Sequence, residues 1–404
     1  MDEVLDRIED SREEMKETLM DLIRIPAIGP DNDGEGEKEK AEFIMDLIED
    51  FGFDSIERYD AEDDRVPSGI RPNIVAEKKG KSDKNLVIVT HMDIVPEGDM
   101  DEWDTDPFEP VFKDGKVYGR GAEDNGQALI SSVFAVKALS DAGIKPHYNV
   151  KVIMVSDEET GSEYGVEHIL EEGIIDEDDL VLVPDHSEEE GRAIEIVEKS
   201  GLWTKIEVHG KQGHAAMPGG TINANRIAAR YQNLVDEELH HEFDEEDELF
   251  SPSTSTFEPT KRLANVPNVN SIPGKETQYF DCRVLPSTPL TKVKKVFESA
   301  AEEFEDETGA SIDIEYIRES DAPEKTPKDS EIVQNLISAV SEVASFKPEV
   351  VGIGGGTVAA HFRDKGIPTA VWCSNKALAH QPNEYAVLDF IVRDCKIFAL
   401  IATG

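Results

Sequence analysis

The chain has 404 residues, 38% of them hydrophobic, and its 87 acidic residues outnumber 41 basic residues to give a net charge of -46. This length favours two domains or one large domain, and the apolar fraction is sufficient for packed cores. Such an acidic surface repels nucleic acid and anionic membranes, so neither is expected as a partner. We interpret the excess acid as a solvated, self-repelling surface of the kind found in salt-adapted proteins.

The cysteines and the first residues of the chain indicate the cellular compartment in which the protein is expected. Cys282, Cys373 and Cys395 are widely spaced and form neither a CxxC pair nor an even-numbered disulfide set, which is typical of thiols in a reducing compartment. The first segment reads as an acidic amphipathic helix rather than a signal peptide, and no apolar run approaches the roughly 18 residues of a membrane span. We therefore expect a cytoplasmic protein.

Short apolar runs alternate with helical patterns through the first half of the chain. Apolar residues near helical spacing predict helices over residues 3–24, 38–51 and 127–139. Three apolar runs predict buried strands over residues 86–89, 150–155 and 180–183. This alternation favours an α/β fold with an open, mostly parallel sheet.

The pattern changes near residue 194. Alternation typical of strands at 193–208 is followed by helix 222–239, a loop at 251–256, strand region 266–284, helix 290–307 and strand 311–317. This order suits a ferredoxin-like α+β insert. The first pattern then resumes with helix 329–345, strand 369–373 and a final helix. We predict an α/β/α domain, residues 1–193 and 319–404, interrupted by a ferredoxin-like α+β domain, residues 194–318.

Polar groups that can bind metal follow several of the predicted strands. They are His91 and Asp93 after LVIVT, Glu158 and Glu159 after VIMVS, Asp185 after LVLV, and His380 after TAVWC. A single such residue is usually a cap or a loop group, but sites in open α/β sheets form at the carboxyl ends of strands. Imidazole and carboxylate ligands suit zinc, cobalt or manganese.

The chemistry of these groups fits together. Two divalent ions need a shared anionic ligand to offset their repulsion, and Asp124 in YGRGAEDNGQ is well placed to bridge them. Asp93 could accept the second ring proton of His91 and fix its tautomer. Of the adjacent Glu158 and Glu159, one can bind metal while the other takes a proton from metal-bound water.

Five segments carry a resemblance to a known family. VTHMDIVPEGD, WDTDPFEP, VYGRGAEDN, VSDEETGS and LAHQPNEY resemble, in order, the signature segments of the di-zinc aminoacylase and glutamate-carboxypeptidase family. That family includes acetylornithine deacetylase, succinyl-diaminopimelate desuccinylase and several dipeptidases, and the similarity covers nearly the whole chain. The resemblance implies two divalent ions, zinc with cobalt or manganese as alternatives, one held by His91, Asp124 and Asp185 and the other by Asp124, Glu159 and His380.

The resemblance also implies roles for other residues. Asp93 would orient His91, Glu158 would be the general base, and the peptide bond after Asp124 would be cis. The domain of residues 1–193 and 319–404 would be catalytic, and the insert would be a lid that also forms a homodimer. From that lid His214 would reach the partner's active site. The implied substrate contacts are Asn270, Arg283, Gly356 and Thr357.

Two departures from the family pattern leave the substrate open between an N-acyl amino acid and a dipeptide. Deacylase relatives often have Gly-Gly-Thr-Asp-Ala-Arg where this chain has Val358 and Ala360 in place of the Asp and the Arg. Arg363 lies three residues beyond Ala360. The ligand Asp185 is Glu in many deacylases and carboxypeptidases, and relatives with Asp there tend to be aminopeptidases or dipeptidases.

Several other interpretations remain open. His361 follows the glycine turn GIGGGT and could touch substrate, whereas His186 beside Asp185 does not match the family pattern. GIGGGT lacks the Lys-Ser/Thr of a phosphate loop, so nucleotide binding is not expected. From another class, the chain could be a non-catalytic binding protein that keeps the fold. We expect instead a hydrolase that acts on a small amide or dipeptide substrate.

Overall fold

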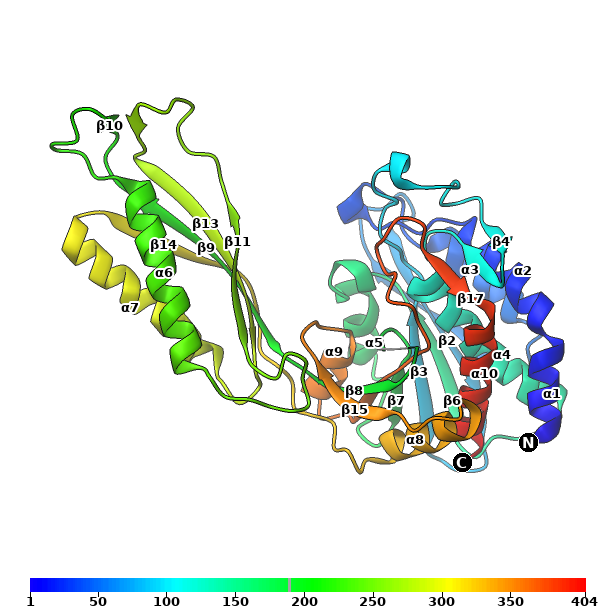
Figure 1. Cartoon of the computed structure of the whole chain (residues 1–404). Helices are drawn as coiled ribbons and strands as arrows, with labels where there is room; N and C mark the ends of the chain where they lie inside the picture. The colour runs from blue at the N-terminus through cyan, green and yellow to red at the C-terminus, as the bar shows by residue number, and fades with distance from the viewer. Residues whose placement is uncertain (188–189) are drawn as a thin grey trace. The chain divides into compact units, whose positions relative to one another are not determined.

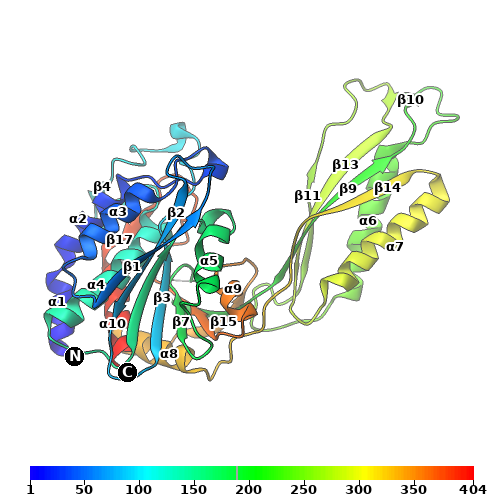
Figure 2. The same cartoon turned by 180° about the vertical axis from the view of Figure 1, so that it is seen from behind.

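The computed structural model of the chain describes residues 1–187 and 190–404. The chain divides into two compact units, seen from opposite sides in Figures 1 and 2. The first unit comprises residues 1–196, 324–351 and 357–404, and the second comprises residues 197–323 and 352–356. The sequence placed the short segment 352–356 in the first domain, but it groups with the second unit because its backbone pairs with residues 199 and 249.

An eight-stranded sheet forms the centre of the first unit, in the order β1-β2-β6-β3-β7-β16-β8-β15. The strands are β1 (Ser55–Glu62), β2 (Ile70–Lys78), β3 (Asn85–His91), β6 (Asn149–Val155), β7 (Leu180–Val183), β8 (Ala193–Glu198), β15 (Glu349–Ile353) and β16 (Thr369–Val371). Strands β6, β3, β7 and β16 run parallel, whereas β1 pairs antiparallel with β2, β2 with β6, and β8 with β16. The parallel centre is buried on both faces, as near-continuous apolar runs require.

Helices cover the two faces of this sheet. One layer contains α1 (Asp2–Asp10), α2 (Arg12–Ile23), α4 (Gln127–Asp141), α8 (Glu331–Val343) and α10 (Leu388–Thr403), which pack on one another. On the other face, α5 (His168–Glu171) and α9 (Ala359–Asp364) pack against alternate valines of β3, β6 and β7. Helix α3 (Lys38–Ile48) packs on β2.

The predicted single helix over residues 3–24 is wrong, since the chain breaks into α1 and α2 at Ser11. The Ser11 hydroxyl donates to the Arg7 carbonyl at 2.9 Å, and the residue has φ -85° and ψ 0°. A serine that bonds back to the preceding turn competes with the helical ladder. Each helix still buries its own apolar positions, Val4 and Ile8 in α1 and Met15 and Leu19 in α2.

A small three-stranded sheet joins two segments that lie far apart in the sequence. Its strands are β4 (Val111–Lys113), β5 (Lys116–Tyr118) and β17 (Tyr385–Val387), in the order β17-β5-β4. Tyr385 pairs with Tyr118 in antiparallel register. The pairing brings the segment that contains His380 beside the turn that contains Asp124.

The second unit is a four-stranded antiparallel sheet with two helices on one face. The sheet has the order β11-β13-β9-β14, from β9 (Ser200–His209), β11 (Thr256–Arg262), β13 (Lys275–Val284) and β14 (Ser311–Ser320). Helices α6 (Ala224–Glu242) and α7 (Leu290–Thr308) bury their apolar faces against it. A ribbon of β10 (Gly213–His214) and β12 (Ser271–Ile272) completes the unit. This strand and helix order is ferredoxin-like.

The predicted fold class, an α/β domain with a ferredoxin-like insert, is confirmed, although several strands were not predicted, among them β1, β2 and β11. β1 and β2 form an antiparallel pair, and β1 has few buried residues. β11 is an edge strand that contains Pro259 and is mostly exposed, so it lacks the alternation that marks a strand. Among the helices in the described part of the chain, none is both long enough and apolar enough to cross a membrane.

The acidic surface makes a prediction about stability. With a net charge of -46, self-repulsion should weaken the folded state at low ionic strength. Raising KCl from about 0.05 M to about 2 M should screen this repulsion. The melting temperature should then rise by at least about 5 °C. A melting temperature that stays flat would contradict the interpretation. Chloride is the salt to use, because sulfate also strengthens apolar burial.

Candidate metal centre

The parallel strands at the centre of the first unit end at one edge of the sheet. β3 ends at His91, β6 leads into Glu158 and Glu159, and β7 is followed within two residues by Asp185. Because β6, β3, β7 and β16 are neighbours with the same direction, their carboxyl ends meet. Apolar side chains bury the strands, so polar groups begin where the strands stop.

The five predicted ligands lie together at this edge. His91 Nε2 is 3.0 Å from Asp124 Oδ1 and 3.5 Å from Asp185 Oδ1. His380 Nε2 is 2.9 Å from Glu159 Oε2 and 3.4 Å from Asp124 Oδ2. Atoms of His91, Asp124 and Glu159 all lie within 4.8 Å of one another, close enough to share an ion. The two oxygens of Asp124 therefore face two different imidazoles.

The turn at Asp124 is held by hydrogen bonds to other parts of the site. The Asp124–Asn125 peptide bond is cis, as the family resemblance implied. The Asn125 side-chain amide donates to Asp185 Oδ1 at 2.8 Å and to the Pro184 carbonyl at 3.1 Å. The turn thus fixes Asp124 and also restrains Asp185.

Glu384 organises the same turn from the opposite side. Its carboxylate accepts backbone N–H bonds from Gly121, Glu123 and Asp124 at 2.8–3.2 Å. The guanidinium of Arg120 donates to it at 2.7 Å. Burial and the nearby Asp124 charge raise the pKa of Glu384 to about 7. Sequence reasoning missed this residue, although it lies in the segment LAHQPNEY; its role depends on the pairing of β17 with β5.

Asp93 connects the end of β3 with the turn after β6. His91 Nδ1 lies 3.0 Å from the Asp93 backbone carbonyl and 3.4 Å from its Oδ1. The Asp93 carboxylate accepts the backbone N–H groups of Glu158 at 3.1 Å and Glu159 at 3.0 Å. Both the backbone carbonyl and the side chain of Asp93 therefore orient His91, where the sequence predicted the side chain alone. The Asp93 carboxylate also holds the turn at Glu158 and Glu159, which the sequence did not predict.

Crowded carboxylates dominate the electrostatics of the site. Burial and the Asp185 charge raise the pKa of Glu158 well above its ordinary value, and burial raises that of Glu159 despite a bond from His380. Hydrogen bonds to Asp124 and Glu159 raise the pKa of His380 to about 10. Burial opposes the charged form of His91, but bonds to Asp124 and Asp185 outweigh it and raise the pKa. The carboxylates of the cluster therefore stabilise a positive charge placed among them.

The donor set fits a divalent ion. Glu159 Oε1 and Asn125 Oδ1 are buried and have no hydrogen-bond partner within the described residues. Buried polar atoms are normally satisfied, so an oxygen left over beside two imidazoles and several carboxylates points to a cation. Imidazole nitrogen with carboxylate oxygen is the ligand mixture that suits zinc, cobalt or manganese.

Two of the predicted site residues lie at one end of the second unit. His214 is exposed on β10, and its Nδ1 accepts the backbone N–H of Ala216 at 3.1 Å. Asn270 accepts a side-chain bond from Asn268 at 2.6 Å, and its carbonyl accepts the N–H of Ala215 at 2.9 Å. These bonds join the His214 segment to the Asn270 segment beside the β10–β12 ribbon. The roles of both residues remain predictions.

Arg283 and the glycine turn are connected within the second unit. Arg283 Nε donates to Asp281 Oδ1 at 2.7 Å, and Nη1 reaches the Gly354 carbonyl at 3.3 Å. Gly356 follows in the same turn, and the Thr357 hydroxyl accepts the N–H of Ala359 at 3.2 Å at the start of α9. The predicted carboxylate contacts Arg283 and Gly356 therefore belong to one local group.

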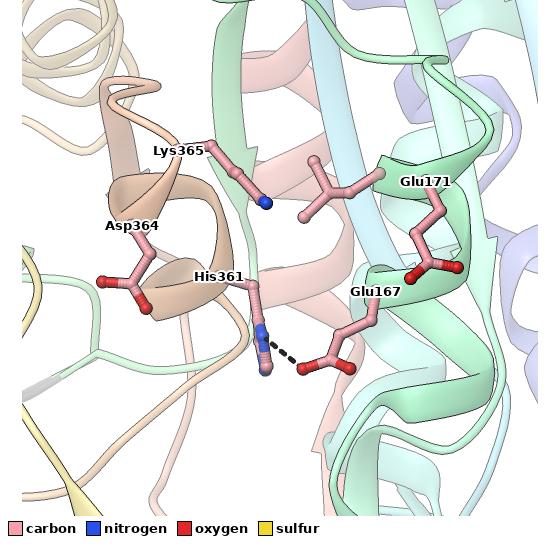
Figure 3. Close-up of a pocket in the computed structure, with 6 residues that line it drawn as sticks. Glu167, Glu171, His361, Asp364 and Lys365 are labelled. Atoms are coloured by element: carbon pink, nitrogen blue, oxygen red, sulfur yellow. Dashed lines mark ion pairs between the residues drawn. The ribbon is translucent and has the colours of Figure 1, made fainter.

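His361 and Arg363, both on α9, have separate surroundings. His361 Nδ1 lies 3.3 Å from Glu167 Oε1 across a pocket lined by charged residues, as Figure 3 shows. Arg363 is buried and pairs with the buried Glu195 through bonds of 2.7 and 3.1 Å. It also donates to the Thr369 carbonyl at 3.0 Å. Arg363 is thus held inside the first unit and does not replace the arginine missing at Ala360.

A cluster of imidazole and carboxylate at the carboxyl edge of an α/β sheet is suited to binding divalent metal ions, which indicates a metal-dependent protein. The model of peptidase family M20/M25/M40 matches residues 87–404, so the chain belongs to this family. The family recognised from the five segments is thereby confirmed. Membership makes the chain a metallohydrolase that acts on peptide or amide bonds.

The chain is similar over most of its length to two curated relatives. An uncharacterized metallohydrolase of Methanocaldococcus jannaschii is 40% identical over 397 residues, which cover 94% of this chain and 96% of the relative. A succinyl-diaminopimelate desuccinylase of Nitratiruptor sp. is 28% identical over 368 residues, with coverage of 90% and 92%.

Solved structures with the same fold include two peptidases. Human carnosine dipeptidase 1 has a TM-score of 0.75 at 17% identity, with 100% of this chain and 98% of that chain covered. A Staphylococcus aureus tripeptidase has a TM-score of 0.77 at 16% identity, with 97% and 98% covered. At these identities the likeness shows the fold alone.

The burial of Arg363 leads to a stability prediction. Arg363→Met leaves Glu195 buried without its bidentate partner, which should lower the free energy of unfolding by about 3–5 kcal/mol in urea titrations. The double variant Arg363→Met, Glu195→Met should recover most of the loss, because neither charge is then buried alone. Two outcomes would contradict the idea that Arg363 and Glu195 stabilise the fold as a pair. One is a double variant as unstable as the single variant, and the other is a single variant as stable as the parent.

Proposed function

We propose that the chain is a hydrolase that uses two divalent metal ions to cleave an amide or peptide bond in a small substrate with a free carboxylate. Zinc is the expected ion, with cobalt or manganese as alternatives. The observation that carries the proposal is the Asp124 carboxylate, whose Oδ1 lies 3.0 Å from His91 and whose Oδ2 lies 3.4 Å from His380. This arrangement suits a bridging ligand.

Each ion would have its own protein ligands in addition to Asp124. His91 and Asp185 would complete one site, since the Asp185 carboxylate lies 3.5 Å from His91. Glu159 and His380, which are 2.9 Å apart, would complete the other. Asp93 and Asn125 would hold these ligands in place through their hydrogen bonds.

Bound divalent ions lower the pKa of a coordinated water and polarise a carbonyl oxygen. Glu158 would accept the proton of the attacking water and return it to the leaving amine. Burial raises the pKa of this carboxylate, a shift in the direction that suits a general base at neutral pH. The Asp93 bond to the Glu158 backbone would keep this side chain at the site.

The second unit, together with Thr357 at the start of the last segment of the first unit, would supply substrate contacts. Arg283 can form two parallel hydrogen bonds to a carboxylate, and the N–H groups of the turn at Gly356 and Thr357 can cradle an anion. Asn270 and His214 would contact the substrate, with His214 reaching the active site of a second copy of the chain. This arrangement requires a homodimer formed by the second unit. The three buried free cysteines agree with the cytoplasm as its location.

Two substrate types fit the proposal. An N-acyl amino acid is favoured by likeness to a protein named as a succinyl-diaminopimelate desuccinylase. A dipeptide or short peptide is favoured by Asp185, by the missing Asp and Arg at Val358 and Ala360, and by the fold shared with a dipeptidase and a tripeptidase. Both types present an amide carbonyl and a free carboxylate.

The general base gives a direct test. Glu158→Gln should keep bound metal but lose about two to four orders of magnitude in kcat, because the amide cannot accept the proton. Metal content by atomic absorption and kcat on the same preparation measure the two effects. Glu163→Gln changes an exposed glutamate four residues after Glu159 and should match the parent in both. A Glu158→Gln variant with most of its activity would rule out the assigned role.

The substrate type and the metal can be tested together. Metal-free protein should be inactive and should regain turnover with zinc, cobalt or manganese on N-acetyl or N-succinyl diamino acids, or on dipeptides. The two substrate groups should differ by at least about tenfold in kcat/KM, because each needs a different set of polar partners. Protein that binds no metal at neutral pH would instead support a non-catalytic binding role.

A further inference from the structure

A buried ion-pair network lies behind the turn that carries Glu158 and Glu159. It consists of Glu37, Asp63, Arg71 and Asp157, which we call the Arg71 network. We propose that Arg71 is a positioning residue for the candidate metal centre, because it holds Asp157 and through Asp157 the turn of residues 157–164. The inference rests on the proposed function of Glu158 and Glu159.

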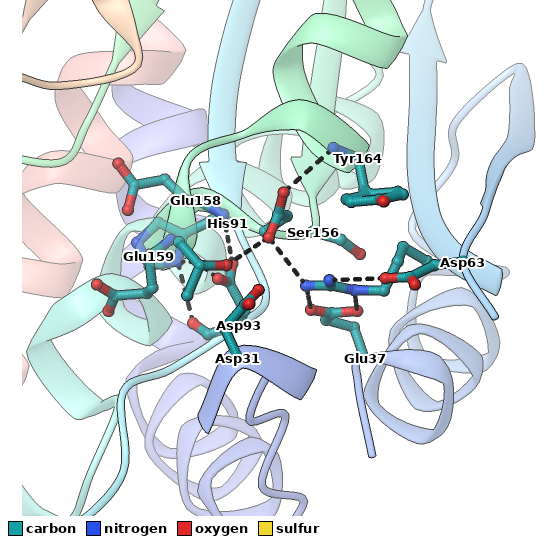
Figure 4. Close-up of polar contacts among 12 residues, drawn as sticks. Asp31, Glu37, Asp63, His91, Asp93, Ser156, Glu158, Glu159 and Tyr164 are labelled. Atoms are coloured by element: carbon teal, nitrogen blue, oxygen red, sulfur yellow. Dashed lines mark hydrogen bonds and ion pairs between the residues drawn. The ribbon is translucent and has the colours of Figure 1, made fainter. Parts of the chain in front are cut away.

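The guanidinium of Arg71 is fully buried and touches three carboxylates. Its Nε and Nη2 donate to the two oxygens of Glu37 at 2.7 and 2.5 Å. Its Nη1 lies 3.5 Å from Asp63, and its Nη2 lies 3.4 Å from Asp157 Oδ1. Figure 4 shows Glu37 and Asp63 on one side of the view and Glu158, Glu159 and His91 on the other, with Asp93 and Ser156 between them. The network thus connects Glu37, directly before α3, and the β1–β2 pair to the turn after β6.

Asp157 organises the turn that follows it. It has φ 63°, a left-handed conformation that costs energy for a residue with a side chain. Its Oδ1 accepts the Thr160 hydroxyl, and its Oδ2 accepts the Tyr164 N–H at 3.2 Å. Its carbonyl accepts the Ser162 N–H at 2.7 Å. The side chain and the backbone of one residue therefore set the path of the chain around Glu158 and Glu159.

The turn is held from two sides by carboxylates with different tasks. Asp93 accepts the N–H groups of Glu158 and Glu159, and Asp157 closes the loop beyond them. Together the two carboxylates restrain both the ligand Glu159 and the base Glu158, which directly follow Asp157 in the sequence.

Stability alone does not explain the Arg71 network. A buried ion pair is costly to desolvate, and apolar residues of similar volume are often as stable or more stable. A positioning role explains why charge is kept here. Three of its members, Glu37, Asp63 and Arg71, precede residue 87, where the match to the family model begins. This chain thus steadies a turn of the matched region with residues outside it.

Neutral hydrogen bonds should keep the segment folded when the charge is changed. Asn73 Oδ1 accepts the Ser156 N–H at 3.0 Å, and Asn73 Nδ2 donates to the Tyr164 carbonyl at 2.8 Å. Conservative variants of the Arg71 network can therefore be studied as folded proteins. Arg71→Lys keeps the charge but loses the two-pronged geometry, and Asp157→Asn keeps the shape but loses the charge.

Arg65 offers a matched control. Its guanidinium lies 5.0 Å from the Tyr164 ring, against 5.6 Å for Arg71, and it donates to the same Asp63 at 2.9 Å. Its hydrogen bonds and ion pairs within the described residues go to Asp31 and Asp63 rather than to Asp157, and its side chain is 43% exposed. Arg65→Lys thus makes the same chemical change beside the same partners without removing a contact to Asp157.

The experiment measures zinc affinity by chelator competition and hydrogen exchange of residues 156–164 in metal-free protein. Arg71→Lys and Asp157→Asn should each lower zinc affinity about 10- to 100-fold. They should also speed exchange in this segment while β3 and β7 exchange as in the parent. Arg65→Lys should match the parent in both. With the preferred substrate, kcat should fall while KM changes little.

Two results would overturn the inference. One is parent-like exchange and zinc affinity, within about threefold, in both Arg71→Lys and Asp157→Asn. The other is an equal loss in Arg65→Lys, which would indicate general loosening of the region. Because exchange is measured without metal or substrate, the inference survives if the parent hydrolyses none of the amides tested, and it fails on exchange even if the parent is an active enzyme.

Discussion

The crowding of carboxylates at one edge of the central sheet is the constraint on which the first unit depends. Asp93, Asp124, Glu158, Glu159 and Asp185 gather where β3, β6 and β7 end, with His91 and His380 between them. Buried carboxylates cannot stay charged together unless cations or N–H donors compensate them. The raised pKa values of both histidines show how strongly the cluster draws positive charge, which a divalent ion can also supply.

The carboxylates of the site divide into two groups by their partners. Asp124, Glu159 and Asp185 face imidazole nitrogens. Asp93, Glu384 and Asp157 accept backbone N–H groups; Glu384 secures the turn at Asp124, and Asp93 and Asp157 secure the turn of residues 157–164. The second group fixes the first, because a ligand on a mobile loop would bind an ion weakly. Ion-binding geometry in this unit is therefore built from main-chain hydrogen bonds to buried acids.

The sequence predicted the first group and Asp93 as site residues, but not Glu384 or Asp157. His91, Glu159 and Asp185 follow apolar strands that any strand pattern reveals, so their shared edge could be inferred. The roles of Glu384 and Arg71 arise from tertiary contacts: Glu384 needs β17 to pair with β5, and Arg71 meets partners from three separate elements. Local sequence patterns also left parts of the fold unpredicted.

The fold was predictable where apolar patterns are long and regular, as in the parallel strands and the helices of the second unit. It was not predictable where one residue decides the outcome. Ser11 divides a continuous helical pattern, and Pro259 lies in an exposed edge strand with little alternation. At Ser11 a side-chain hydrogen bond interrupts the helix although the apolar pattern continues. At Pro259 the strand lies at the edge of the sheet and is mostly exposed, so its sequence shows little alternation.

The surface charge bears on how this chain could recognise a carboxylate. A net charge of -46 repels anions at long range, and the arginine expected near Ala360 is absent, while Arg363 is buried against Glu195. Binding of a substrate carboxylate would then depend on Arg283, whose guanidinium donates to the Gly354 carbonyl in the glycine turn. Salt screens the long-range repulsion but has much less effect on a short, two-pronged Arg–carboxylate contact. An acidic surface and a carboxylate substrate are therefore compatible where salt is high.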